Sequence, residues 1–164
     1  MTKYLALSAF FLSSLLLQAD EPDQKVVAQE IAATIRAVYT PDYDLLLKHT
    51  HEEVLKLAGG EKAFKKGLKQ THEFLISKNV SIESVAVGKT LDYFETAENE
   101  FFFVATRIMI KVGEKVQAAP GHQLAVRKKD TKVWKYIDCS ALNDELVRKM
   151  FPDFPKDQKL PNGK

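Results

Sequence analysis

The chain contains a single cysteine, Cys139, so it cannot form a disulfide within itself. A domain of 164 residues can fold on its apolar core, because dependence on disulfides belongs mainly to much smaller domains. Cys139 follows an apolar segment with the pattern of a strand, and we interpret it as a buried strand residue. A bridge to a second chain is the alternative.

A large charge of either sign is also lacking. The 24 Lys and Arg residues nearly balance the 22 Asp and Glu residues, which leaves a formal net charge of +2. A nucleic-acid-binding domain typically has a pI above about 9 and a concentrated basic stripe. The composition therefore predicts no nucleic-acid partner, and it predicts one globular domain with a real core.

A membrane-spanning helix is not predicted, because the apolar run Leu5–Leu17 is shorter than the roughly 20 residues that such a helix needs. Lys3 precedes the run, and the small residue Ala19 follows it, which is the pattern of a secretory signal. We therefore predict that residues 1–19 are a signal peptide and that the protein is exported to the periplasm or secreted. An uncleaved anchor is the alternative.

The zinc-protease signature H-E-x-x-H is missed by one residue. The stretch His49–Leu55 reads HTHEEVL, with leucine where the second zinc-binding histidine would stand. Two zinc-binding histidines must share one helix face, whereas His49 and His51 would lie about 200° apart on a helix. Thr50 and Glu53 have the spacing of a capping box instead, so we predict that a helix begins at Thr50.

The sequence predicts no cofactor and no metal site. The pair Gly59–Gly60 lacks the flanking pattern of a phosphate-binding loop and is typical of a helix C-terminus. A weaker hypothesis is a metal site that joins His49 or His51 to Glu52 or His72. No Ser-His-Asp or Cys-His order is evident, although such sites are assembled in space.

Helical spacing of apolar residues dominates the first half of the chain. It predicts a helix over 22–39, and Pro41 then favours a break followed by a short helix over 41–48. A third segment begins at Thr50, and residues 61–78 form the longest amphipathic helix, with lysines on its polar face. Those lysines are interpreted as a solvated face.

Beyond Asn79 the pattern changes to strands over 80–89, 100–112, 115–129 and 133–140, split by turn signals at Gly88, Gly113–Glu114 and Lys129–Thr131. Pro120–Gly121 predicts a bulge or an interruption. Helices followed by hairpin-linked strands indicate an α+β fold, with helices packed on one face of an antiparallel sheet of about four strands.

A short helix is predicted after Asn143, and it completes a single domain over residues 20–150. Residues 151–164 are a Pro-containing C-terminal tail, because their prolines forbid a continued helix. We expect three apolar residues of the tail to pack against the domain and hold the tail on its surface: Phe151, Phe154 and Leu160.

The order of helices and strands, with AVYTPDYDLLLKHTHEEV near its start, resembles the nuclear transport factor 2-like superfamily, which includes ketosteroid isomerase. In that superfamily the first helix often ends near a tyrosine and an acidic turn follows, which Tyr39 and Asp42–Asp44 match. The resemblance implies three N-terminal helices that close over a curved sheet as a cone, a pocket inside, and often a homodimer. A closer likeness is to small exported bacterial proteins.

The resemblance does not extend to the catalytic base. The isomerases carry an acidic base between their second and third helices, whereas residues 49–64 of this chain read as helix and cap. Our leading hypothesis is therefore an exported, non-catalytic domain that binds a small ligand or a protein partner. Its candidate ligand-binding residues are Tyr39, Tyr43, Arg107, Trp134 and Tyr136.

The alternative is a small exported enzyme of isomerase, dehydratase or hydrolase type that uses acid–base chemistry in the cone pocket. Its candidate catalytic residues are Tyr39, Asp44, His49 and Asp138.

Arg107 alternates with Phe101 and Phe103, so it is predicted to lie on an apolar strand face where an unpaired guanidinium is costly. An anionic ligand, Asp138, a dimer contact or water reached by a long side chain would relieve that cost. Trp134 shares a strand face with Tyr136 and Asp138. Two interpretations of the aromatic pair remain open, a pocket wall and ordinary core.

Overall fold

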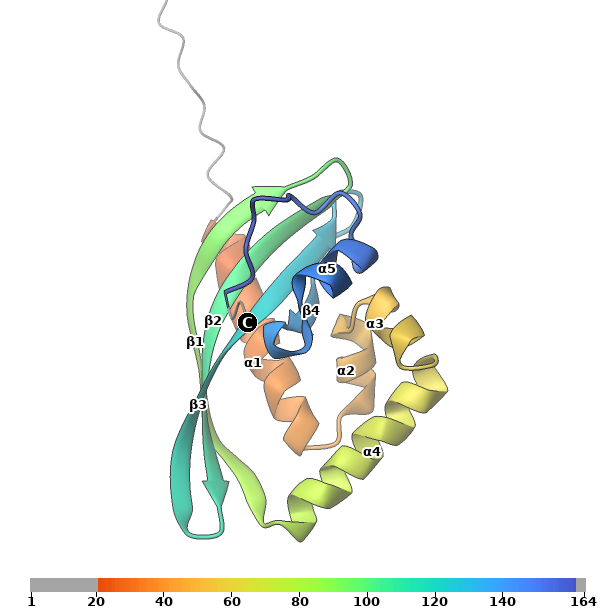
Figure 1. Cartoon of the computed structure of the whole chain (residues 1–164). Helices are drawn as coiled ribbons and strands as arrows, with labels where there is room; N and C mark the ends of the chain where they lie inside the picture. Colours follow the sequence, from red (N-terminus) through yellow and green to blue (C-terminus); the bar gives the residue numbers. More distant parts are fainter. Residues whose placement is uncertain (1–20, 162–164) are drawn as a thin grey trace, which may run out of the picture.

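The computed structural model describes residues 21–161, so the predicted signal peptide over residues 1–19 lies outside the described residues. Within 21–161, four helices precede a four-stranded antiparallel sheet and a fifth helix follows it, which confirms the α+β class (Figure 1). The helices are α1 (Glu21–Tyr39), α2 (Tyr43–His49), α3 (Glu52–Leu57), α4 (Glu61–Ser77) and α5 (Asp144–Met150), and the short 3-10 helix η1 (Cys139–Ala141) precedes α5. The strands are β1 (Val80–Glu95), β2 (Asn99–Val112), β3 (Lys115–Lys128) and β4 (Lys135–Asp138).

Helix α1 forms where the sequence predicts it. Its apolar residues Val27, Ile31 and Ile35 recur every four positions and are all buried against the sheet. The resemblance implies three N-terminal helices, and this expectation is wrong for the described residues, which contain four helices before the sheet. The spacing of the residues predicts four helical segments, and an extended link does separate α2 from α3.

The predicted capping box is also wrong, because Thr50 closes α2 instead of opening α3. The Thr50 hydroxyl donates to the carbonyl oxygen of Leu46 at 2.6 Å. The N-cap of α3 is His51, whose Nδ1 accepts a hydrogen bond from the backbone N–H of Glu53 at 3.2 Å. Thr50 is extended, and it forms an isolated parallel bridge with Tyr136 on the outer edge of β4.

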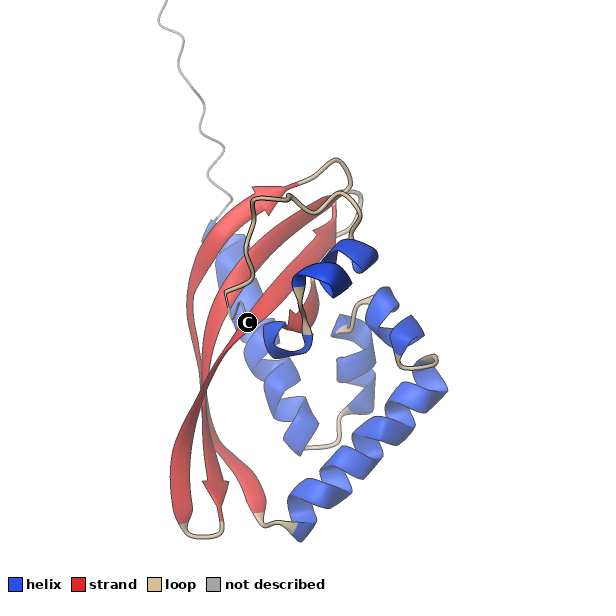
Figure 2. Cartoon of the chain, in the orientation of Figure 1, coloured by secondary structure: helices blue, strands red, loops and turns tan. Residues whose placement is uncertain are grey.

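The strands run in the order β1-β2-β3-β4 in a curved sheet that does not close into a barrel (Figure 2). The predicted turn at Gly113 is confirmed, since this glycine adopts φ +61° between β2 and β3. The turn at Gly88 is not, because β1 continues to Glu95 and only shifts its register between Val87 and Thr90. Pro120–Gly121 does not interrupt the pairing of β3 with β2.

Helices pack against both faces of the sheet, which corrects the expectation that they pack on one face only. On β2, Phe102 and Val104 lie in the cluster that includes the buried side chains of α1. The alternate residues Phe101 and Phe103 lie in a second cluster with α5 and the C-terminal segment. In Figure 1 that segment runs across the front of the sheet.

The C-terminal tail is part of the core, as its apolar residues predict. Phe151, Phe154 and Leu160 are each at most 6% exposed. They pack in the same cluster as Phe101 and Phe103 of β2. The prolines of this segment prevent a helix but leave these side chains free to point inward.

Candidate functional site

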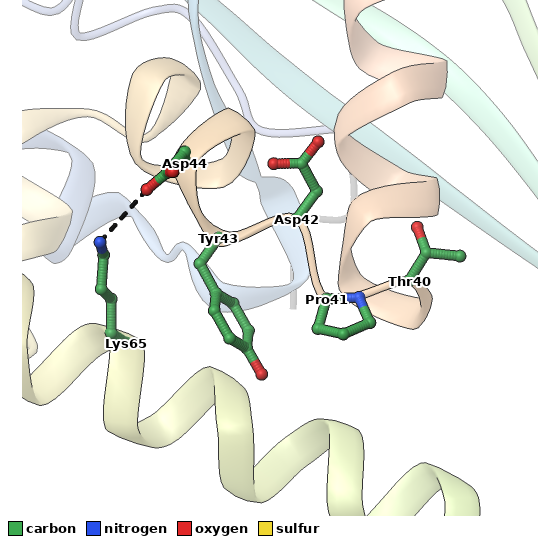
Figure 3. A pocket seen from close by; sticks show the side chains of 6 residues that line it. All are labelled: Thr40, Pro41, Asp42, Tyr43, Asp44 and Lys65. Atoms are coloured by element: carbon green, nitrogen blue, oxygen red, sulfur yellow. Dashed lines mark hydrogen bonds and ion pairs between the residues drawn. The ribbon is translucent and has the colours of Figure 1, made fainter.

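The turn between α1 and α2 forms an open hollow that contains Tyr43 and Asp44, two residues predicted for the site (Figure 3). The Asp44 carboxylate pairs with Lys65 Nζ at 3.2 Å, and its side chain is 92% exposed. In Figure 3 the Tyr43 ring points toward α4 and away from Asp44. Of the residues that line the hollow, all except Tyr43 are exposed. An exposed pair contributes at most about 1 kcal/mol, so the hollow holds no strongly desolvated group.

Three other predicted residues, His49, Trp134 and Tyr136, meet in the core between α1, α2 and β4. His49 Nδ1 lies 3.1 Å from the carbonyl oxygen of Trp134, and the His49 ring stacks on Tyr136 with centroids 5.5 Å apart. Because a carbonyl only accepts, Nδ1 carries the hydrogen. The Tyr136 hydroxyl donates to Glu30 Oε2 at 2.5 Å, and the same oxygen lies 3.7 Å from His49 Nδ1.

This cluster ties α1 and α2 to β4. Burial and the hydrogen bond to Glu30 raise the pKa of Tyr136 above its usual range, so the phenol remains a hydrogen-bond donor. Glu30 was missed by the sequence analysis. The available signal was its place directly before Ile31 in the apolar stripe of α1, where a carboxylate needs a partner.

Trp134 is only 1% exposed and packs between two neighbours. The guanidinium carbon of Arg127 lies 4.4 Å from the centroid of its ring, and the Phe102 ring lies 5.0 Å away. Its Nε1 has no hydrogen-bond partner among the described residues. The structure therefore places Trp134, like Tyr136, in the core of the domain.

The remaining predicted residues lie apart from this cluster. Arg107 is exposed on β2, so its guanidinium is solvated and needs no buried partner. Tyr39 is half-buried at the end of α1, and burial raises its pKa. Asp138 is exposed and accepts a hydrogen bond from the backbone N–H of Ser140 at 2.8 Å, which caps η1. Thus Tyr39, Asp44, His49 and Asp138 are not assembled at one place.

Asp138 also lines a cavity of about 450 Å³ between β2, β3 and η1. Cys139 also lines this cavity, and it is buried as predicted but lies in η1 and not in a strand. Burial together with the Asp138 charge raises the pKa of the thiol to about 12. The thiol is therefore protonated at neutral pH and is a poor nucleophile. Asn143, another lining residue, caps α5 through its side chain.

A second cavity, of about 550 Å³, lies between the α2–α3 segment and the β3–β4 connection. We call it the α3–β4 groove. Aliphatic side chains from both sides form its walls, and several charged groups and one histidine lie among them. Its lining residues are Leu47, Lys48, Thr50, His51, Glu52, Leu55, Glu61, Val126, Lys128, Thr131, Val133 and Lys135.

His51 and Thr50 are the buried polar residues of the groove, and His51 is 6% exposed. The edge of its ring contacts Phe151, with centroids 4.9 Å apart. Burial is the main effect on its pKa and lowers it, so the ring is neutral at pH 7. Because Nδ1 accepts from Glu53 N–H, the hydrogen of the neutral ring is on Nε2.

Two lysines connect the sheet side of the groove to the helix side. Lys128 Nζ pairs with Glu52 Oε1 at 3.0 Å, and this contact lowers the pKa of Glu52. Lys135 Nζ donates to the carbonyl oxygen of Lys48. The first pair joins residues 76 positions apart and the second joins residues 87 apart, so no local motif reveals the groove.

Comparison of the chain with protein-family models, curated proteins and solved structures finds no match. No helix within 21–161 is long and apolar enough to cross a membrane. In the same part of the chain, no group of three or more His, Cys, Asp or Glu side chains is placed to hold a metal ion. The function is therefore inferred from the geometry of the cavities.

The histidine cap of α3 predicts a loss of stability in acid. The pKa of His51 is lowered by folding, so its contribution is present above its ordinary value of 6.5 and is lost as the pH falls below it. Protonation also removes the Nδ1 acceptor. We expect His51→Asn, which keeps a side-chain cap, to reduce the slope of unfolding free energy against pH by up to about 1.4 kcal/mol per pH unit.

Urea denaturation between pH 7.5 and 5 measures that slope for both proteins. Equal slopes for the wild type and His51→Asn would show that protonation of His51 does not lower the free energy of unfolding, which would contradict the prediction. Similar stability of the two proteins at pH 7.5 is the control that asparagine caps the helix.

Proposed function

We propose that the protein is an exported, non-catalytic domain that binds a small ligand in the α3–β4 groove. The observation that carries the proposal is the groove itself, about 550 Å³ in volume, with aliphatic side chains in both walls and charged and polar side chains among them. Small-molecule sites typically have volumes of about 300–1,000 Å³ and this mixture of surfaces.

The walls of the groove come from elements that the fold holds firmly. Thr50 is bridged to β4, and the buried His51 caps α3 between the two helices. Val126 of β3 is buried at the base of the same region. A site built on helices and strands is largely formed before the ligand arrives, which lowers the entropy cost of binding.

We also propose that the protein is exported, that its domain is a cone and that it forms a homodimer. The pattern of residues 1–19 supports export, and the order of helices and strands supports a cone of the nuclear transport factor 2-like superfamily. A second copy has a surface available at the far end of the sheet, where Val112 and Val116 are exposed. A native mass spectrum of the mature protein measures the mass of the chain, the oligomeric state and the mass of any bound ligand in one experiment.

We expect protein recovered from an exporting bacterial host to carry extra mass that disappears on denaturation. The substitution Val133→Trp should reduce the fraction with extra mass at least about tenfold, because the indole ring occupies part of the groove. Val133 is 41% exposed, so a larger side chain there does not overpack the core. Native mass spectrometry of both proteins measures the effect.

The matched control is Val26→Trp. Val26 is a similarly exposed valine, at 44%, and it lies on α1 outside the lining of the groove. Its variant should keep the bound mass. If Val133→Trp keeps it as well, the ligand lies elsewhere. The proposed function is wrong if the wild-type protein shows no extra mass from a bound ligand and if, in addition, a fragment library perturbs no groove residue in NMR spectra.

A further inference from the structure

The charges around the α3–β4 groove are unbalanced. Three lysines and two acids line it, which leaves one positive charge in excess. Lys128 is already paired with Glu52 at 3.0 Å. His51 adds no charge at pH 7, because burial lowers its pKa. The excess therefore lies with Lys48 and Lys135, beyond the Glu52–Lys128 pair.

Lys135 is the half-buried member of the three lysines, whereas Lys48 and Lys128 are exposed. Its Nζ donates to the carbonyl oxygen of Lys48, and the Glu52 carboxylate of the same groove is paired with Lys128. Burial lowers the pKa of Lys135, the charge of Glu52 opposes this shift, and the charge of Lys48 adds to it. A half-buried ammonium whose neighbouring carboxylate is paired with a second lysine is only partly compensated, and a ligand carboxylate can supply the missing counter-charge.

We infer that the groove binds a small organic anion, with a carboxylate that pairs with Lys135 and an apolar body that lies against the aliphatic walls. This inference rests on the proposed function and names the ligand class of the same groove. A cationic ligand would place a third positive charge beside Lys135 and Lys48. A neutral ligand would add no negative charge beside the Lys135 ammonium.

The aliphatic side chains on the two opposite walls of the groove indicate that the ligand has an apolar part. Leu47 and Leu55 lie on the helix side, and Val126 and Val133 lie on the sheet side. Contact between these side chains and a hydrocarbon chain removes apolar surface from water on both partners. A small, fully polar anion would pair with Lys135 but would leave these walls in contact with water.

Three probes with the same octyl chain separate the two contributions: octanoate, octanamide and octylammonium. Isothermal titration calorimetry at pH 7 is expected to show that octanoate binds at least about tenfold more tightly than octanamide, and that octylammonium binds most weakly. The preference for octanoate over octanamide should diminish at alkaline pH, because Lys135 loses its proton at a lower pH than an ordinary lysine.

Substitution of the lysine assigns the effect to one side chain. Lys135→Met should weaken octanoate binding at least about tenfold and octanamide binding much less, whereas Lys135→Arg should retain most of the affinity for octanoate. Lys132→Met is the matched control, because Lys132 is exposed on the neighbouring loop and does not line the groove. Octanamide binding and thermal unfolding report whether each variant is folded.

The outcomes distinguish the inference from the proposed function. Equal binding of octanoate and octanamide by the wild type would leave the groove as a binding site but would overturn the anionic ligand. An equal loss in Lys132→Met and Lys135→Met would also overturn it, because net charge and not Lys135 would then attract the probe. If none of the probes binds, the inference is wrong, while the Val133→Trp experiment still decides the proposed function.

Discussion

A chain that ends after Met150 is expected to lose its cooperative fold, although it retains every helix and strand of the sheet domain. The missing segment carries three buried side chains, Phe151, Phe154 and Leu160. At about 1.5–3 kcal/mol each, their burial is worth about 5–9 kcal/mol. That is comparable with the whole free energy of unfolding of an ordinary domain, about 5–15 kcal/mol.

The contacts of the segment explain the size of this effect. The Phe151 ring meets Phe101 edge-on with centroids 5.3 Å apart. Phe154 meets Phe94 at 5.2 Å and Phe101 at 5.5 Å in the same way. Arg148 Nη1 donates to the carbonyl oxygens of Phe154 and Pro155, which fixes the path of the segment beside α5. Without it, Phe94 and Phe101 lose their aromatic neighbours, and part of this face of the sheet is exposed to water.

Circular dichroism and urea denaturation measure the loss. A chain that ends after Pro161 is the control, because it removes only residues 162–164 and should unfold like the wild type. Phe154→Ala provides an intermediate case, with an expected loss of about 3–5 kcal/mol. A truncated protein with a cooperative transition within about 1 kcal/mol of the wild type would show that the segment only covers a core that is stable without it.

The sequence predicts the elements that depend on local periodicity. Val27, Ile31 and Ile35 identify α1, and the β2–β3 turn follows from Gly113. The misplaced features depend on contacts across the fold. Thr50 has the spacing of a cap but forms a bridge with β4. Gly88 has the composition of a turn, yet β1 continues through it, where a Cβ atom would lie 3.3 Å from the backbone oxygen of Ala105.

The candidate site is harder to predict from the sequence than the fold is. Tyr43 and Asp44 are neighbours in the chain and remain neighbours in space, but they lie in an exposed hollow. The groove instead brings together residues that lie far apart in the chain. Glu52 and Lys128 are 76 positions apart, and Lys48 and Lys135 are 87 apart. A single sequence without an alignment contains no signal for such pairs. The sequence identified His51 and Glu52 only as part of a weak metal hypothesis.

The second large effect is a loss of stability in alkali that comes from the only cysteine. Cys139 is 1% exposed, and burial with the neighbouring Asp138 charge raises the pKa of its thiol from 9.0 to about 12. A group whose pKa is raised by folding stabilises the protein below its unfolded value. That contribution is lost as the pH rises from about 9 toward 12, because only the unfolded chain releases the proton.

The loss approaches about 1.4 kcal/mol per pH unit, and it amounts to about 2 kcal/mol between pH 9 and 11. Three tyrosines whose pKa is raised by burial, Tyr39, Tyr93 and Tyr136, add to the loss mainly above their ordinary pKa of 10.0. The interval from pH 9 to 10 therefore reports mainly on Cys139. Urea denaturation at pH 7, 9, 10 and 11, with a reductant present, measures the free energy of unfolding across this range.

Cys139→Ala separates the thiol from the other titrating groups. At pH 7 the variant should be less stable by about 1–2 kcal/mol, because it leaves a small cavity in the core. Its stability should then fall less steeply than that of the wild type above pH 9, so that the order of the two proteins reverses near pH 11. Parallel curves would mean that the buried thiol ionises as easily in the folded protein as in the unfolded chain, and that water reaches this part of the core.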